Sequence, residues 1–367
     1  MHIDSNLTRL STIEMNTIIG KSKSASEVFL YLNGKIQVRK FADTLKDFAG
    51  NIPAAGLADI LNAKLIEYNP GVKPDSIRRR VRDWLSGKQE PRERKDFIKI
   101  CFALKLSEYQ ASRFLSLTTD GAFHLRNPEE LVYAFALRTG MDYPETIEML
   151  NSLGPLDKTR AEGNFVLTKS IEFLFAGIKD KESFHKFYHE NKNYLGELHN
   201  TAYQYLLIFL EILTKPSPHP YATPEHEYTL DEIMNEYLRM NIPLNKKTAN
   251  YTLLQKTIKK YWPNTTSLMR MKNRTEDVSR RILLILYLIT EGFISTDDDY
   301  LLDEDLTELE HFEEHYWRLN SILNECGLAR LDPRNVFDWL VLYSLKTSDD
   351  GEMRKRMEEV LALIYDG

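Results

Sequence analysis

Cysteine is scarce in this sequence, and glycine and proline are few. The two cysteines, Cys101 and Cys326, are too few for a disulfide framework, which predicts a cytoplasmic protein. With 16 glycines and 14 prolines in 367 residues, the chain is not of a collagen-like or low-complexity class. Apolar runs stay well below the ~18 residues of a membrane-spanning helix. The N-terminus carries Asp4 and Glu14 and lacks the apolar core of a secretory signal. We therefore expect no contact with a membrane.

Charge is unevenly distributed along the chain. The net charge is −6, yet residues 73–105 hold eleven basic and five acidic side chains, and residues 246–281 hold ten basic and two acidic ones. Residues 297–314 hold ten acids and no lysine or arginine. Two basic stretches and one acidic block thus stand out, and the basic stretches are candidates for binding an anionic partner.

Apolar residues recur with a helical period, and the alternation typical of strands is nearly absent, so we predict an all-α protein. Four prolines between Pro216 and Pro224 exclude continuous helix there. Thr229 before Asp231 and Glu232 predicts the start of another helix. The expected parts are an N-terminal lead (1–35), a helix-turn-helix-like module with an extra helical pair (36–155), a helical segment (156–214), a proline-rich connection (215–229) and a larger helical C-terminal region (230–367).

The most informative stretch begins at Pro74, which predicts the start of a helix. Ile77, Val81, Trp84 and Leu85 form one apolar stripe of that helix, and Gly87 is expected to close it in a left-handed conformation. The opposite face carries four arginines: Arg78, Arg79 and Arg82, with Arg80 at the flank. The guanidinium fork suits phosphates and the O6 and N7 edge of guanine. Pro91 predicts the start of the next helix, and Ser107–Leu117 a further short one.

The order of these residues resembles the Cro/C1-type (XRE-like) helix-turn-helix family. The resemblance covers about 60 residues: Phe41–Phe48 as the first helix, Leu57–Asn62 as the helix before the turn, the Arg-rich helix, and the two helices after it. Asn62 stands where the family has glycine, and Ala63 to Lys73 would make an unusually long turn. The resemblance implies a recognition helix at Asp75–Leu85. Base contacts would fall to Arg78, Arg79 and Arg82, and phosphate contacts to Arg80, Lys88 and Arg92.

Other interpretations of the charged segments remain open. An Arg-rich face can be plain solvated surface. In the second basic segment, Tyr251, Tyr261 and Trp262 could contact a nucleic-acid backbone, but an exposed helical face with Leu253, Leu254, Ile258 and Trp262 packed inward is favoured. The acidic block could pair with either basic stretch or simply be solvated. The run from Leu283 to Ile289 is apolar nearly all round, which predicts burial in a core, in a partner or in both.

Catalytic patterns are weak. His311 and His315 with Glu314 match the His-x-x-Glu-His pattern of inverted zinc peptidases. No third ligand is marked downstream, so a polar helix face is the favoured interpretation. Neither cysteine has an adjacent histidine, and there is no nucleophile motif. We expect no enzyme activity, no cofactor and no metal.

Taken together, these features predict a DNA-binding transcriptional regulator. The N-terminal module would read double-stranded DNA, and the C-terminal region would form a homodimer or sense an effector. The alternative is a helical interaction or defence-associated scaffold whose basic faces bind acidic proteins, because such a fold can be reused for protein contacts.

Overall fold

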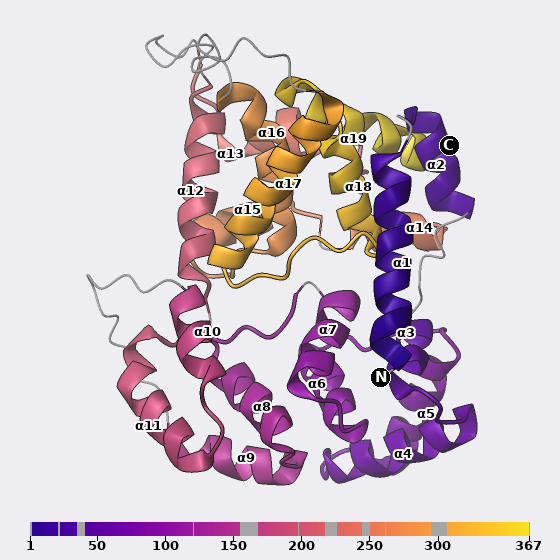
Figure 1. Cartoon of the computed structure of the whole chain (residues 1–367), viewed down its shortest axis with the longest axis vertical. Helices are drawn as coiled ribbons and strands as arrows, with labels where there is room; N and C mark the ends of the chain where they lie inside the picture. The colour runs from indigo at the N-terminus through magenta and orange to yellow at the C-terminus, as the bar shows by residue number, and fades with distance from the viewer. Residues whose placement is uncertain are drawn as a thin grey trace. The chain divides into compact units, whose positions relative to one another are not determined.

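The computed structural model describes residues 2–20, 23–34, 41–119, 121–154, 168–196, 198–216, 226–243, 250–260, 262–294 and 307–366. These ranges contain nineteen α-helices and no β-strand, which confirms the all-α prediction (Figure 1). Among the same residues, no helix is both long and apolar enough to cross a membrane.

The chain divides into two compact units. The first unit comprises Arg39–His199 and Glu325–Ala329, and the second comprises His2–Val38, Asn200–Asn324 and Arg330–Gly367. This division differs from the predicted one, in which the first 35 residues were a lead and a boundary fell at residue 155. Residues 168–199 join the first unit, and the N-terminal helices join the second.

The first unit is built from nine α-helices within its described residues. They are α3 (Phe41–Ala49), α4 (Ala54–Glu67), α5 (Pro74–Leu85), α6 (Arg94–Ala103), α7 (Glu108–Thr118), α8 (Pro128–Thr139), α9 (Tyr143–Ser152), α10 (Thr168–Ala176) and α11 (Lys181–Asn191). A cluster of edge-on rings joins α3, α5, α6 and α7. Phe41 lies 5.4 Å from Phe97 and 6.0 Å from Phe114 between ring centroids, and Phe48 lies 5.4 Å from Phe114. The Trp84 ring of α5 lies 6.4 Å from Phe41, so this aromatic core fixes α5 on the unit.

The turn before α5 is shorter than predicted. Helix α4 continues through Asn62 and ends at Glu67, so only residues 68–73 separate it from α5. The predicted long turn from Ala63 is wrong because Leu61 and Leu65 continue the buried stripe of α4 for another turn. Helices α4 and α5 pack directly on one another.

The end of α5 follows the prediction, whereas the start of α6 does not. Gly87 has φ +70°, its N–H donates to the Trp84 carbonyl, and the N–H of Lys88 donates to the Asp83 carbonyl. These two bonds are the glycine-terminated helix end expected at this position. Helix α6 begins at Arg94 rather than near Pro91, so Arg92 lies in the connection between the two helices.

The second unit contains the other ten α-helices of the described residues. They are α1 (His2–Ile19), α2 (Ala25–Gly34), α12 (Asn200–Thr214), α13 (Leu230–Ile233), α14 (Leu253–Lys259), α15 (Thr265–Lys272), α16 (Arg280–Ile294), α17 (Glu308–Glu325), α18 (Val336–Leu345) and α19 (Asp350–Asp366). A π-helical turn, Met234–Leu238, follows α13. The predicted helix start at Thr229 is confirmed, since its hydroxyl accepts from the N–H of Glu232.

Helix α16 is the centre of the second unit and packs against α12, α18 and α19. Every side chain from Ile282 to Ile289 is at most 3% exposed. The predicted burial of this apolar helix is confirmed, and the chain's own helices provide the cover.

The N-terminal helices belong to this packing. Glu14 of α1 accepts a 2.9 Å hydrogen bond from the Tyr31 hydroxyl of α2 and a 3.1 Å bond from the Trp339 indole of α18. The rings of Tyr31 and Trp339 stack with centroids 5.4 Å apart. The predicted N-terminal lead therefore contains two helices, α1 and α2, that pack in the second unit.

The second basic segment is mostly as predicted. Leu254, Ile258 and Trp262 are buried, but Leu253 is 41% exposed, which corrects its inward placement. Arg281 is buried and donates to the carbonyls of Ile258 and Lys260 at 2.8 and 2.6 Å. Residues 246–249 and Tyr261 lie outside the described residues, as do residues 297–306 of the acidic block.

Candidate nucleic-acid interface

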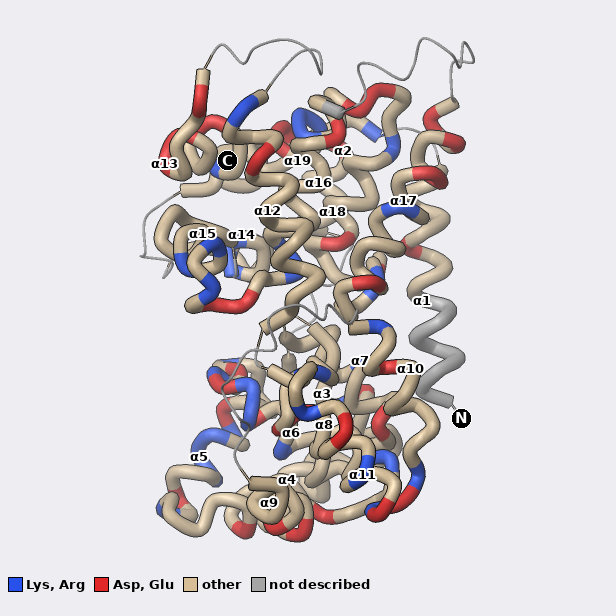
Figure 2. Tube along the Cα trace, turned by 90° about the vertical axis from the view of Figure 1, so that its left-hand side faces the viewer, with Lys and Arg blue, Asp and Glu red and all other residues tan. Residues whose placement is uncertain are grey.

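Helix α5 separates its apolar and basic residues onto opposite faces. Ile77 and Val81 are 1% exposed and Trp84 is 4% exposed, which anchors one face in the core. The other face carries the three predicted base-reading residues, Arg78, Arg79 and Arg82, and all three are exposed. Figure 2 shows this concentration of basic residues at α5. The sequence prediction of which arginines face solvent is confirmed, while their contact with DNA stays a prediction.

The exposed arginines form few ion pairs, and those that they form are weak. Arg78 donates to Asp75 at 2.8 Å, and both side chains are more than half exposed. Arg82 lies 3.9 Å from the Asp83 carboxylate. Exposed ion pairs of this kind contribute about 0–1 kcal/mol, so an incoming phosphate or base edge can replace them. Neither a hydrogen bond nor an ion pair engages the Arg79 side chain within the described ranges.

Arg80 differs from its neighbours. Its guanidinium lies 3.4 Å from the Asp96 carboxylate of α6 and 5.8 Å from the centre of the Trp84 ring. Burial raises the pKa of Asp96, and the charges of Arg80 and Lys99 oppose this rise. Arg80 therefore links α5 to α6. A DNA phosphate would have to compete with the Asp96 carboxylate for this guanidinium.

Lys88 and Arg92, the other predicted phosphate contacts, are both exposed. Lys88 follows Gly87 in the helix-ending turn, and Arg92 lies in the connection to α6. The structure thus places both beyond the C-terminal end of α5.

Two basic residues of the 73–105 stretch stabilise the fold of the first unit instead of facing a ligand. Arg94 donates to both oxygens of Glu130, at 2.5 and 2.9 Å, and to the Thr119 hydroxyl at 2.8 Å. Lys99 donates to the Asn69 side chain at 2.5 Å, and burial lowers its pKa. The surplus of positive charge in the sequence is therefore only partly available to a ligand.

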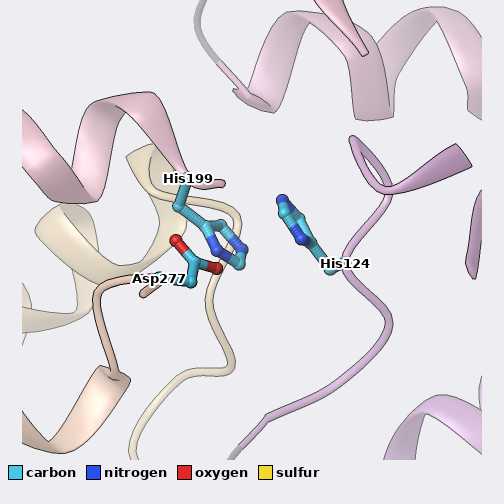
Figure 3. A group of neighbouring side chains, drawn as sticks. All are labelled: His124, His199 and Asp277. Atoms are coloured by element: carbon cyan, nitrogen blue, oxygen red, sulfur yellow. The ribbon is translucent and has the colours of Figure 1, made fainter. Parts of the chain in front are cut away.

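Two histidines of the first unit stack face to face. The rings of His124 and His199 have centroids 3.5 Å apart and are inclined by 15° (Figure 3). His124 is buried, and its Nε2 has no hydrogen-bond partner. Burial, followed by the charges of His199, Arg126 and Arg94, lowers the pKa of His124 well below its ordinary value. Sequence reasoning did not single out this pair, because its members are far apart in the chain.

The lowered pKa of His124 predicts loss of stability in acid. The unfolded chain binds a proton near pH 6.5 that the folded chain does not, so folding weakens as the pH falls below that value. The slope is up to about 1.4 kcal/mol per pH unit for one such group. Urea titrations at pH 7.5 and 5.5, read by hydrogen exchange of α7 and α8, should show a smaller loss for His124→Phe than for the unmodified chain. Equal losses would contradict the assignment.

The histidines of the zinc-peptidase pattern are not on a polar face. His311 and His315 are 5% and 2% exposed, which corrects that interpretation. The Glu314 side chain is 47% exposed and pairs with Arg318. The two imidazoles instead meet Asp350, which sequence reasoning missed because it follows 35 residues later on another helix.

The candidate interface thus offers three exposed guanidinium groups on a rigid helix and two further cations beyond its end. Such groups donate paired hydrogen bonds to guanine edges and neutralise phosphates. No family model, curated protein or solved structure matches the chain, so its function is inferred from its own residues.

Proposed function

We propose that this protein is a DNA-binding transcriptional regulator that reads duplex DNA through α5. The observation that carries the proposal is the division of α5 into a face buried by Ile77, Val81 and Trp84 and a face exposing Arg78, Arg79 and Arg82. A short helix fixed to a compact unit by its apolar side fits the width of the major groove.

The two sets of cations have different tasks in this proposal. Arg78, Arg79 and Arg82 read base edges, because a guanidinium can donate two parallel hydrogen bonds to guanine O6 and N7. Lys88 and Arg92 neutralise phosphates and position the helix, without reading sequence. Arg80 joins them only by giving up its pair with Asp96.

A cytoplasmic homodimer is part of the same proposal. One recognition helix reads few base pairs, whereas two related by a two-fold axis reach half-sites about 34 Å apart. Because α16 is covered by the chain's own helices, the dimer contact must use another surface.

Arg79 and Lys88 give the direct test. Arg79→Ala should weaken binding to a selected site by about 1–3 kcal/mol and flatten the base preference, because a base contact is lost. Lys88→Ala should weaken all duplexes about equally and reduce the salt slope by about 0.9. Fluorescence anisotropy with the selected and a random duplex, at two salt concentrations, measures both effects.

The matched control is Lys186→Ala on α11, where the lysine is 75% exposed and 3.9 Å from Glu190. It removes one positive charge from a surface with no assigned role, so both affinities should stay close to those of the unmodified protein. Equal losses on both duplexes for Arg79→Ala would refute base reading. Absence of salt-dependent DNA binding would instead favour the alternative of a scaffold that binds acidic proteins.

A further inference from the structure

Four helices of the second unit converge on a buried cluster of two histidines and an aspartate. His311 and His315 lie one turn apart on α17, with ring centroids 4.2 Å apart. Asp350 is the first residue of α19, and one of its oxygens, Oδ1, lies 2.6 Å from His311 Nε2 and 2.9 Å from His315 Nε2. Three atoms that commonly bind metal ions therefore point at one another.

The other nitrogen of each ring is engaged by a second layer of groups. His311 Nδ1 lies 3.2 Å from the carbonyl oxygen of Leu345, at the end of α18. His315 Nδ1 lies 2.8 Å from the Tyr287 hydroxyl and 3.9 Å from the Glu291 carboxylate, both on α16. Histidines that bind metals are oriented in this way, with Nδ1 held by a carbonyl or another polar group and Nε2 directed at the ion.

Close packing fixes the backbone next to Asp350, whereas its side chain keeps some freedom. A Cβ on Gly292 of α16 would stand 3.0 Å from the Cα of Gly351, so these two helices meet at glycine. The Asp350 side chain is 16% exposed, whereas the side chains of His311 and His315 are only 6% and 3% exposed. Asp350 therefore has the most room to adjust of the three groups.

The charges of the cluster suit a cation. The Asp350 carboxylate lies against the Nε2 atoms of both imidazoles, so it is the acidic group that would pair with an ion bound there. The nearby Glu291 carboxylate is paired with Arg318 at 2.6 Å.

We propose that His311 Nε2, His315 Nε2 and the Asp350 carboxylate bind one divalent transition-metal ion of the zinc class. Two imidazoles and one carboxylate favour such an ion over Mg²⁺ or Ca²⁺, which take oxygen ligands. Tetrahedral bonds of ~2.0–2.1 Å would place the ligand atoms about 3.3 Å apart. That arrangement requires a modest withdrawal of the Asp350 carboxylate from both rings.

Within this proposal the role of the ion is structural, and water takes the fourth position that the three protein ligands leave open. In a hydrolytic site of the His-x-x-Glu-His type, the glutamate would act as the base beside the metal. Here the Glu314 side chain is 47% exposed and its carboxylate is paired with Arg318. The ion would instead hold α17 to the first turn of α19, and it would do so whether or not α5 binds DNA.

Metal titration of the full chain tests the proposal. After treatment with EDTA, the protein is titrated with Zn²⁺ in competition with a coloured chelator, and separately with Co²⁺ to record the absorption of the bound ion. We expect one tight equivalent and a rise in the melting temperature of the second unit. Asp350→Asn and His311→Gln should each weaken Zn²⁺ binding by at least ~100-fold, and Tyr287→Phe by ~10-fold, because it removes an orienting group.

Two controls separate this site from other histidines. His185→Gln alters a second pair with the same spacing, since His189 lies one turn further along α11. His124→Gln alters the buried stacked pair of the first unit. Both variants should still bind one equivalent of Zn²⁺ tightly. Circular dichroism establishes that each variant is folded. Failure of the unmodified chain to bind Zn²⁺ saturably would overturn the proposal, as would unchanged binding by folded Asp350→Asn.

Discussion

Replacing Asp338 by alanine is expected to lower the free energy of unfolding of the second unit by about 3–5 kcal/mol. Asp338 accepts two hydrogen bonds from the guanidinium of Arg280, at 2.7 and 2.8 Å, and the two side chains are 3% and 7% exposed. It also accepts from the N–H of Asp332 at 2.9 Å. Arg280 also donates to the carbonyl oxygen of Arg330 at 3.1 Å, but the substitution removes the buried carboxylate that faces this cation.

The size of this effect comes mainly from the charge that is left behind. A buried ion pair stabilises the folded state little more than well-packed apolar residues would, because both ions lose their hydration on folding. Removing one partner is costly because the other stays buried and uncompensated. The double variant Arg280→Met with Asp338→Leu should therefore be far more stable than Asp338→Ala alone.

Hydrogen exchange of amides in α16 and α18 measures the change within the second unit, so that unfolding of the first unit does not mask it. The matched control is Glu352→Ala, which removes the partner of Lys355 at 3.0 Å on the surface of α19. That exposed pair should contribute less than about 1 kcal/mol. A similar loss of unfolding free energy for Asp338→Ala and Glu352→Ala would show that burial does not increase the cost of breaking the Arg280 pair.

Local signals in the sequence predicted local structure well. Pro74 and Gly87 bound α5, and the spacing of Ile77, Val81 and Trp84 identified its buried face. Start signals such as Thr229 are also read correctly, because the capping side chain and its target are three residues apart.

Features that depend on distant contacts could not be predicted in this way. Arg280 counts as positive charge in the sequence, yet it is buried because Asp338 lies across from it on α18. His311 and His315 fit a known spacing, but Asp350 joins them only through the packing of α19. The polar N-terminal segment carries no strong local signal for helix α1. The packing of α1 depends on Trp339, which lies 325 residues after Glu14 in the chain.

Trp84→Ala is the other substitution with a large expected effect, about 3–5 kcal/mol in the first unit. The Trp84 ring is 4% exposed and lies edge-on to Phe41 with centroids 6.4 Å apart. Its removal leaves a cavity beneath α5, on the side opposite Arg79. Because the arginines are useful only on an ordered helix, we expect amides of α5 to exchange faster and the affinity for the selected duplex to fall with them.

The control for this effect is Trp84→Phe, which keeps an aromatic ring in the core and should lose much less stability. Trp84 is the only tryptophan between Arg39 and His199, so hydrogen exchange rather than fluorescence must follow the first unit. The expected order for both α5 protection and DNA affinity is unmodified protein, Trp84→Phe, then Trp84→Ala. If Trp84→Ala lost α5 protection but kept full affinity for the selected duplex, recognition by the Arg78, Arg79 and Arg82 face would be excluded, because those side chains would no longer be held in one orientation.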